Sequence, residues 1–138
     1  MRSFGRTPSL FRFALMKCVI IMNKSITFEK SKIFAVRIVK LYNHLKDNKK
    51  EYVLSKQLLR CGTSIGANIH EGNYAASRAD FINKFQIALK ECYETEYWLN
   101  IMKDADIIDE ETYNEYFAKC SKIRKLLSKS LKTAKDNV

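Results

Sequence analysis

Two residues of this 138-residue chain have types and a spacing that could perform acid–base chemistry on a phosphate. Arg37 and His44 stand seven residues apart, so on a helix they lie two turns apart along one face. An arginine can stabilise a phosphate, and a histidine near neutral pH can take up or give a proton. The pair therefore raises the hypothesis of RNA cleavage.

The spacing resembles the Arg-x(4-6)-His motif of HEPN domains, and a HEPN-like ribonuclease is one alternative function for the chain. The pair is also explained without chemistry, since such a spacing arises easily by chance on a basic helix. The pair lies on the expected first helix, beside an ordinary polar segment. We therefore predict no catalytic residues and a protein that is not an enzyme.

Other reactive patterns are incomplete. Neither histidine has a glutamate three residues before it, as a di-iron bundle requires, and His70 with Glu71 lacks the second histidine of HExxH. The segment from Gly62 to Gly66 lacks the Gly-Lys-Ser/Thr ending of a phosphate-binding loop. The four cysteines form no CxxC pair. We expect no metal and no cofactor, with reduced cysteines in a cytoplasmic protein.

A further set of polar residues lies on or beside the apolar seam of two expected helices. A carboxylate pair among them could do acid–base work, but no reacting group is near. We interpret the set as a buried hydrogen-bond network that sets helix register. Its members are Arg60, Ser64, Asn68, Glu71, Glu91 and Glu94.

Apolar residues at alternating steps of four and three predict the elements that position these side chains. They indicate amphipathic helices over residues 25–47, 51–73, 77–103 and 109–135. Caps are expected from Asp47 or Asn48 for the second helix and from Ser77 for the third. One proline and four glycines leave few breaks, so the fold class is all-α, an antiparallel up-down-up-down four-helix bundle.

Glycines mark the second helix more than any other feature. Gly62 and Gly66 stand one turn apart, and glycine destabilises a helix interior by about 1 kcal/mol relative to alanine. Their presence there predicts a close approach by a neighbouring helix. The alternative is a kink near Gly62.

Residues 1–23 differ from the rest, with basic residues around an apolar run that Lys17 interrupts. A signal peptide lacks support because no small-x-small cleavage site follows, and the run is too short to span a membrane. We expect an upstream extension that is disordered or loosely attached, with Met22 or Met16 as the natural start. The bundle domain is then residues 24–138.

Basic residues outnumber acidic ones by 25 to 15, a formal charge of +10. Such a surplus suggests a polyanion partner, RNA or DNA, although lysine-rich faces can also be merely solubilising or can dock an acidic protein. The second half of the last helix carries more basic residues than the helix dipole explains. The candidate nucleic-acid-binding residues are Lys119, Lys122, Arg124, Lys125, Lys129 and Lys132, with Arg37, Lys40 and Arg78 as additions.

Three segments carry a family resemblance: Leu59-Arg-Cys-Gly-Thr-Ser-Ile-Gly-Ala-Asn-Ile-His-Glu-Gly72, Ser77 to Phe81, and Ala88-Leu-Lys-Glu-Cys-Tyr-Glu-Thr-Glu-Tyr-Trp-Leu99. Over residues 25–134 the chain resembles the bacterial four-helix bundle proteins named after 23S rRNA intervening sequences. The resemblance implies a homopentameric, barrel-like ring. It also implies relatedness to the accessory protein of diversity-generating retroelements, which binds a reverse transcriptase and nucleic acid through a basic surface.

Together these expectations describe a non-enzymatic, oligomeric nucleic-acid-binding adaptor without a membrane segment. Its ring would pack through the second apolar faces of the helices at 51–73 and 77–103, and a reverse transcriptase is the protein partner that the resemblance implies. The alternative is a structural assembly protein that binds no nucleic acid.

Overall fold

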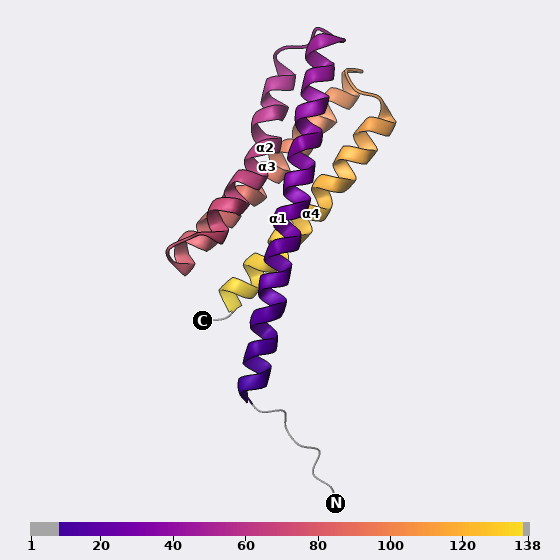
Figure 1. Ribbon diagram of the computed structural model, residues 1–138. Coiled ribbons are helices and arrows are strands. Elements are labelled where there is room, and N and C mark those ends of the chain that lie inside the picture. Colours follow the sequence, from indigo (N-terminus) through magenta and orange to yellow (C-terminus); the bar gives the residue numbers. More distant parts are fainter. Residues whose placement is uncertain (1–8, 137–138) are drawn as a thin grey trace, which may run out of the picture.

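A computed structural model of the protein describes residues 9–136, with every side chain in that range except that of Ser25. It contains four α-helices, shown in Figure 1, and no strand within the described range. The helices are α1 (Ser9–Asp47), α2 (Leu54–Asn73), α3 (Arg78–Asp104) and α4 (Glu110–Asp136). The predicted all-α fold with four helices is confirmed.

The helices run up, down, up and down, with a short connection at each end of the bundle (Figure 1). Each packs on two neighbours: α1 on α2 and α4, and α3 on α2 and α4. The α1–α4 contact is the smallest of the four. In this square arrangement every amphipathic helix buries its apolar stripe against its neighbours, and short loops suffice to connect the helices.

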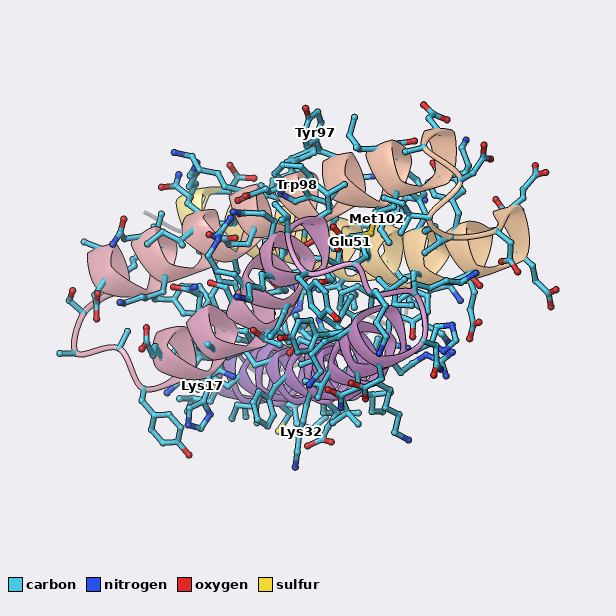
Figure 2. The ribbon with its side chains drawn as sticks, turned by 90° about the horizontal axis from the view of Figure 1, so that it is seen from above. Lys17, Lys32, Glu51, Tyr97, Trp98 and Met102 are labelled. Carbon is cyan, nitrogen blue, oxygen red and sulfur yellow. The ribbon has the colours of Figure 1, made fainter. Side chains whose placement is uncertain are left out.

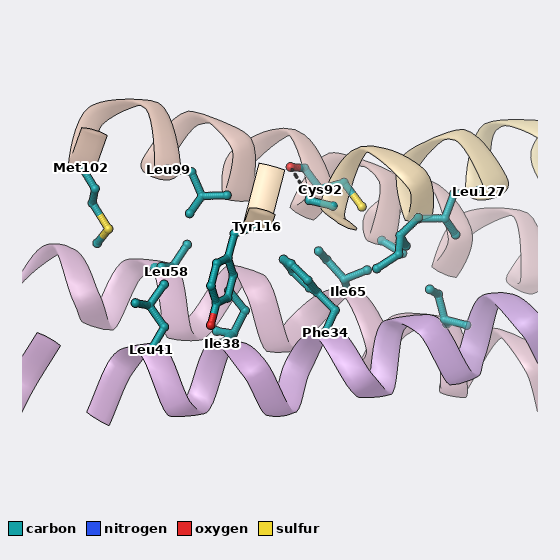
Figure 3. Close-up of a cluster of buried hydrophobic side chains, with 14 of the residues drawn as sticks. Phe34, Ile38, Leu41, Leu58, Ile65, Cys92, Leu99, Met102, Tyr116 and Leu127 are labelled. Atoms are coloured by element: carbon teal, nitrogen blue, oxygen red, sulfur yellow. Dashed lines mark hydrogen bonds between the residues drawn. The ribbon is translucent and has the colours of Figure 1, made fainter. Parts of the chain in front are cut away.

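The core consists of the stripes that the three–four spacing predicts (Figure 3). Phe34 and Ile38 of α1 lie against Ile65 of α2, and Tyr116 of α4 closes the cluster from the other side. Burial differs from the expected apolar seam at two places in α2: Ile69 is fully buried and Asn68 only half-buried, and Ser55 is fully buried and Leu54 only half-buried. Cys61, Cys92 and Cys120 are fully buried in this core, where a thiol packs as a small hydrophobe.

The α2 glycines allow the close approach of α1. A Cβ atom on Gly62 would lie 2.9 Å from Cγ1 of Ile38, and one on Gly66 would lie 3.4 Å from the backbone oxygen of Ser31. The helix continues through both positions. The predicted reason for glycine at these positions is therefore confirmed: a side chain there would enter the space that α1 occupies.

Polar side chains define where three helices begin. Ser77 Oγ accepts a 3.1 Å hydrogen bond from the Asp80 amide, as predicted, and Asp109 Oδ1 accepts one of 2.7 Å from the Thr112 amide. At α2 the prediction was wrong, because neither Asp47 nor Asn48 caps the helix. The carboxylate of Glu51 does so, and this residue was expected inside the helix.

Glu51 acts from outside α2. Its Oε1 accepts from the amides of Val53, at 3.1 Å, and Leu54, at 2.9 Å, while Oε2 accepts from the Ser55 amide at 2.7 Å. The backbone just before it is left-handed at Lys50, with φ of 55°. The chain reverses there, so α2 begins three residues later than the apolar pattern indicates.

The amino-terminal part of α1 also differs from expectation. Residues 9–23 were expected to be disordered or loosely attached, whereas they form a helix continuous with the bundle-packed part of α1, projecting past the bundle in Figure 1. No glycine or proline interrupts residues 9–47, so the helix propagates once its later turns are anchored. Residues 1–8 lie outside the described range. Within residues 9–136, no helix is long and apolar enough to cross a membrane.

Candidate nucleic-acid interface

Four of the predicted lysines form one line on α4. Lys122, Lys125, Lys129 and Lys132 recur at steps of three, four and three, so they share a face of the helix. All four are exposed, and the buried stripe of α4 lies on the opposite side. We call these four residues the α4 lysine stripe. Among the described residues, none of the four has an acidic partner within ion-pair distance.

Lys119 lies at the edge of this face. It is half-buried and likewise forms no ion pair within residues 9–136. Lysine ammonium groups on a solvated helix face act as mobile point charges, which suits contact with phosphates rather than with base edges. The arrangement can therefore supply charge along a line without reading a sequence.

Arg124 is on the same helix but has a different role. Its Nε donates a 2.8 Å hydrogen bond to Oε1 of Glu96 on α3, and its guanidinium lies 5.3 Å from the centre of the Tyr93 ring. The hydrogen bond with Glu96 raises the pKa of Arg124. The side chains are 23% and 11% exposed, so the pair is largely withdrawn from solvent. Arg124 therefore joins α3 to α4 instead of extending the lysine stripe.

Arg37 is also engaged within the protein. It forms an ion pair with Glu115 of α4, and its guanidinium lies 5.5 Å from the centre of the Tyr116 ring. The Tyr116 hydroxyl donates a 2.9 Å hydrogen bond to the backbone oxygen of Arg37. Lys40 is exposed one turn further along α1. Both residues lie toward the acidic start of α4, so the structure does not bring them to the lysine stripe.

Arg78 occupies a different position again. It is the first residue of α3, exposed, and it lines a pocket together with Lys24 of α1 and Lys129 of the stripe. The sequence interpretation missed Lys24, because a single lysine just before the expected start of the first helix carries no periodic signal. Its proximity to Arg78 and Lys129 depends on how α1, α3 and α4 meet.

The six residues of the predicted polar network form separate groups. Arg60 pairs with Glu94, and its Nη1 lies 3.5 Å from Oε2 of Glu91. Trp98 Nε1 donates to Glu94 Oε1 at 3.2 Å. Burial, and next the charge of Glu94, raise the pKa of Glu91. This first group links α2 to α3, but the Arg60 side chain is 52% exposed, so the predicted burial is wrong for this group.

The remaining members do not join that group. Asn68 Nδ2 donates to the backbone oxygen and to Oγ of Ser64, at 2.9 and 3.0 Å, so this contact stays within α2. Glu71 is exposed and pairs at 3.0 Å with Lys84 of α3. The six residues thus do not form the single buried network that was expected. They form two ion-paired links from α2 to α3 and one hydrogen-bonded contact within α2.

The two residues of the ribonuclease hypothesis have separate partners. His44 Nδ1 lies 2.8 Å from Nδ2 of Asn48, while Arg37 faces Glu115. A pocket between the carboxyl-terminal end of α1 and the α3–α4 connection is lined by His44 but not by Arg37. Among the described residues, no group of three histidine, cysteine or acidic side chains could hold a metal ion.

The sequence profile of the 23S rRNA-intervening sequence protein family matches residues 23–129. This chain belongs to that family. It is also 51% identical to a crystallised protein of unknown function from the S23 ribosomal protein family of Bacteroides thetaiotaomicron. That match covers 80% of this chain and 98% of the other, with a TM-score of 0.79. No curated protein matches the chain. The resemblance inferred from residues 59–99 is confirmed as far as the family.

Proposed function

We propose that this member of the 23S rRNA-intervening sequence family is a non-enzymatic, homo-oligomeric adaptor that binds RNA or DNA in the cytoplasm. The observation that carries the proposal is the α4 lysine stripe. Its four ammonium groups are exposed on one face and none is neutralised by an acidic side chain of the described chain. A rise of 1.5 Å per residue makes the stripe about 15 Å long, enough to follow several phosphates.

The stripe favours contact with a nucleic-acid backbone over readout of its bases. Lysine ammonium groups release counterions from phosphates and carry little geometric information. Stacking on aromatic side chains would add affinity for single strands, and α3 exposes Tyr93 and Tyr97. The interface proposed here is therefore electrostatic, with little sequence preference.

The adaptor role needs a surface for assembly, and α1 exposes several large apolar side chains. Ile26, Ile33 and Val36 are 44%, 59% and 50% exposed along its outer side. Tyr97 projects outward from α3 in Figure 2. The sequence interpretation placed assembly on the outer faces of α2 and α3. Since exposed apolar area of this kind indicates association, we place it on α1 and α3, within the five-membered ring that the family resemblance implies.

A salt titration tests the nucleic-acid part of this proposal. Fluorescence anisotropy with a labelled single strand and a labelled duplex should show binding at low salt that weakens steeply as salt rises. No binding at low salt, or tight binding that ignores salt, contradicts it. A reverse transcriptase is the protein partner that the resemblance implies, and co-purification with one encoded beside this gene tests that part.

The second candidate is an assembly protein whose lysines only keep it soluble. The exposed apolar side of α1 favours this function as much as the first, because it does not depend on charge. Light scattering that shows an oligomer, together with an absorbance ratio that shows no co-purified nucleic acid, would favour the second candidate.

A further inference from the structure

A pocket of about 540 Å³ lies where three parts of the chain meet. Its walls come from the first half of α1, the turn between α2 and α3, and the carboxyl-terminal half of α4. The volume falls within the range of sites for small ligands. None of the residues identified above as linking helices, such as Arg124 or Arg60, lines it.

Three cationic side chains from three helices line this pocket: Lys24, Arg78 and Lys129. Among the described residues that line it, none is an aspartate or glutamate. Cations gathered around a concave surface make its potential positive. The charge alone indicates an anionic ligand, and arginine and lysine together suit a phosphate.

The other walls indicate that the ligand is more than an inorganic anion. Ile20 and Leu126 contribute apolar side chains to the lining. Phe81 contributes an aromatic wall, with Lys24 Nζ 4.5 Å from the centre of its ring. Inorganic phosphate has no apolar part that could cover this wall.

We propose that this pocket binds a nucleotide. Its phosphate contacts the three cations, and its base lies along the apolar wall that includes Phe81. The assignment deepens the proposed nucleic-acid-binding function, because Lys129 belongs both to the pocket and to the α4 lysine stripe. A nucleotide held here is either one unit of a strand lying along the stripe or a free mononucleotide.

Isothermal titration with adenosine and uridine 5′-monophosphates tests the assignment on the full chain. Each mononucleotide should bind at least about tenfold more tightly than inorganic phosphate or the matching nucleoside, because only the nucleotide satisfies both parts of the pocket. Equal affinity for phosphate and nucleotide would show a simple anion site and overturn the proposal. So would the absence of mononucleotide binding at millimolar concentration.

Two exposed lysines provide a matched pair of variants. Lys129→Met removes a cation that lines the pocket, and Lys56→Met removes one on α2 that lies outside both the pocket and the α4 lysine stripe. Both side chains are exposed on a helix, so folding should be little affected by either substitution. We expect Lys129→Met to weaken mononucleotide binding by about tenfold and Lys56→Met to leave it unchanged. Equal effects of the two substitutions contradict a localised site.

The two sources of the nucleotide, and the two proposals, are separated by competition. Displacement of a labelled RNA strand by the mononucleotide would show that the pocket holds a unit of the strand, whereas its binding without displacement would show a free nucleotide. Salt-sensitive strand binding without mononucleotide binding would leave the proposed function standing and remove the pocket assignment. Mononucleotide binding without strand binding would support the pocket assignment and contradict the proposed nucleic-acid-binding function.

Discussion

Arg124 of α4 donates a 2.8 Å hydrogen bond to Glu96 of α3, although 28 residues separate them in the sequence. The pair lies beside the α4 lysine stripe. Because Glu96 holds Arg124, the only arginine of α4 does not contribute to phosphate contact. Arginine forms the more ordered pair with a carboxylate because its planar guanidinium offers several fixed donors. One basic residue of α4 thus holds the bundle together while its lysine neighbours remain exposed.

Glu96→Ala should destabilise the bundle by leaving Arg124 without its partner. We expect a loss of about 1 to 3 kcal/mol in the free energy of unfolding, below the cost for a fully buried pair because Arg124 keeps some solvent contact. Urea unfolding measures it. The double variant Glu96→Leu with Arg124→Leu should recover most of the loss, and a single variant as stable as the wild type would contradict the role assigned to the pair.

The effect of Gly62→Ala on the stability of the protein should change sign with the residue that faces Gly62. In the wild type the new methyl group would lie 2.9 Å from Ile38 Cγ1, and overpacking of this kind costs about 1 to 3 kcal/mol. In an Ile38→Ala background that space is open, so the same substitution should stabilise through helix propensity, by up to about 1 kcal/mol. A thermal-unfolding double-mutant cycle measures both. The same sign in both backgrounds would show that α1 does not approach Gly62 closely.

Glu51→Gln should destabilise the protein at neutral pH and not in acid. Burial raises the pKa of Glu51, but the amides of Leu54, Ser55 and Val53 outweigh that effect and lower it below the ordinary value of 4.5. A depressed carboxyl pKa stabilises the folded state above the unfolded pKa, and this contribution is lost as the pH falls through the folded pKa. We expect a difference of about 1 kcal/mol at pH 7 that shrinks below about pH 4.5.

The measurement is urea unfolding of both proteins across that pH range. Glu110→Gln is a suitable control, because Glu110 is exposed in the first turn of α4 and no hydrogen bond of its side chain is observed within residues 9–136. A difference between Glu51→Gln and the wild type that stays constant into acid would rule out the carboxylate as the cap of α2.

Removing lysines from the stripe should reduce the salt dependence of nucleic-acid binding. Each neutralised phosphate contributes about 0.7 to 0.9 to the slope of log affinity against log salt, so Lys122→Met with Lys125→Met should lower the slope by up to about 2. Lys40→Met serves as the comparison, since Lys40 lies on α1 away from the stripe. An equal reduction by Lys40→Met would place the interface elsewhere.

Assembly should depend on the outer side of α1. Ile33 is 59% exposed, so Ile33→Glu costs the isolated bundle little, whereas burying a carboxylate at an apolar interface is unfavourable. We expect the variant to be smaller than the wild type by light scattering, with unchanged helicity. Tyr74→Glu, at an exposed position in the α2–α3 turn, should keep the wild-type size. An unchanged size for Ile33→Glu would move assembly to another face.

The fold was within reach of the sequence because helical spacing, breaks and caps are local. Steps of three and four residues indicate each buried stripe, and Ser77 followed by Asp80 marks the start of α3. The glycines of α2 further indicated where a neighbour comes close. The start of α2 was less predictable. Nothing in the sequence around Glu51 shows that its carboxylate accepts hydrogen bonds from the first amides of α2.

The sequence by itself determined four amphipathic helices, their order and a surplus of positive charge on α4. Only the tertiary structure decided which of those charged side chains are free of ion pairs within the described chain and so available to contact a phosphate. Arg124 and Lys125 are neighbours in the sequence, yet one is held by Glu96 of another helix and the other is exposed without an ion pair in the described chain. Helix periodicity repeats within an element, whereas ion pairing and the gathering of Lys24, Arg78 and Lys129 depend on how separate elements meet.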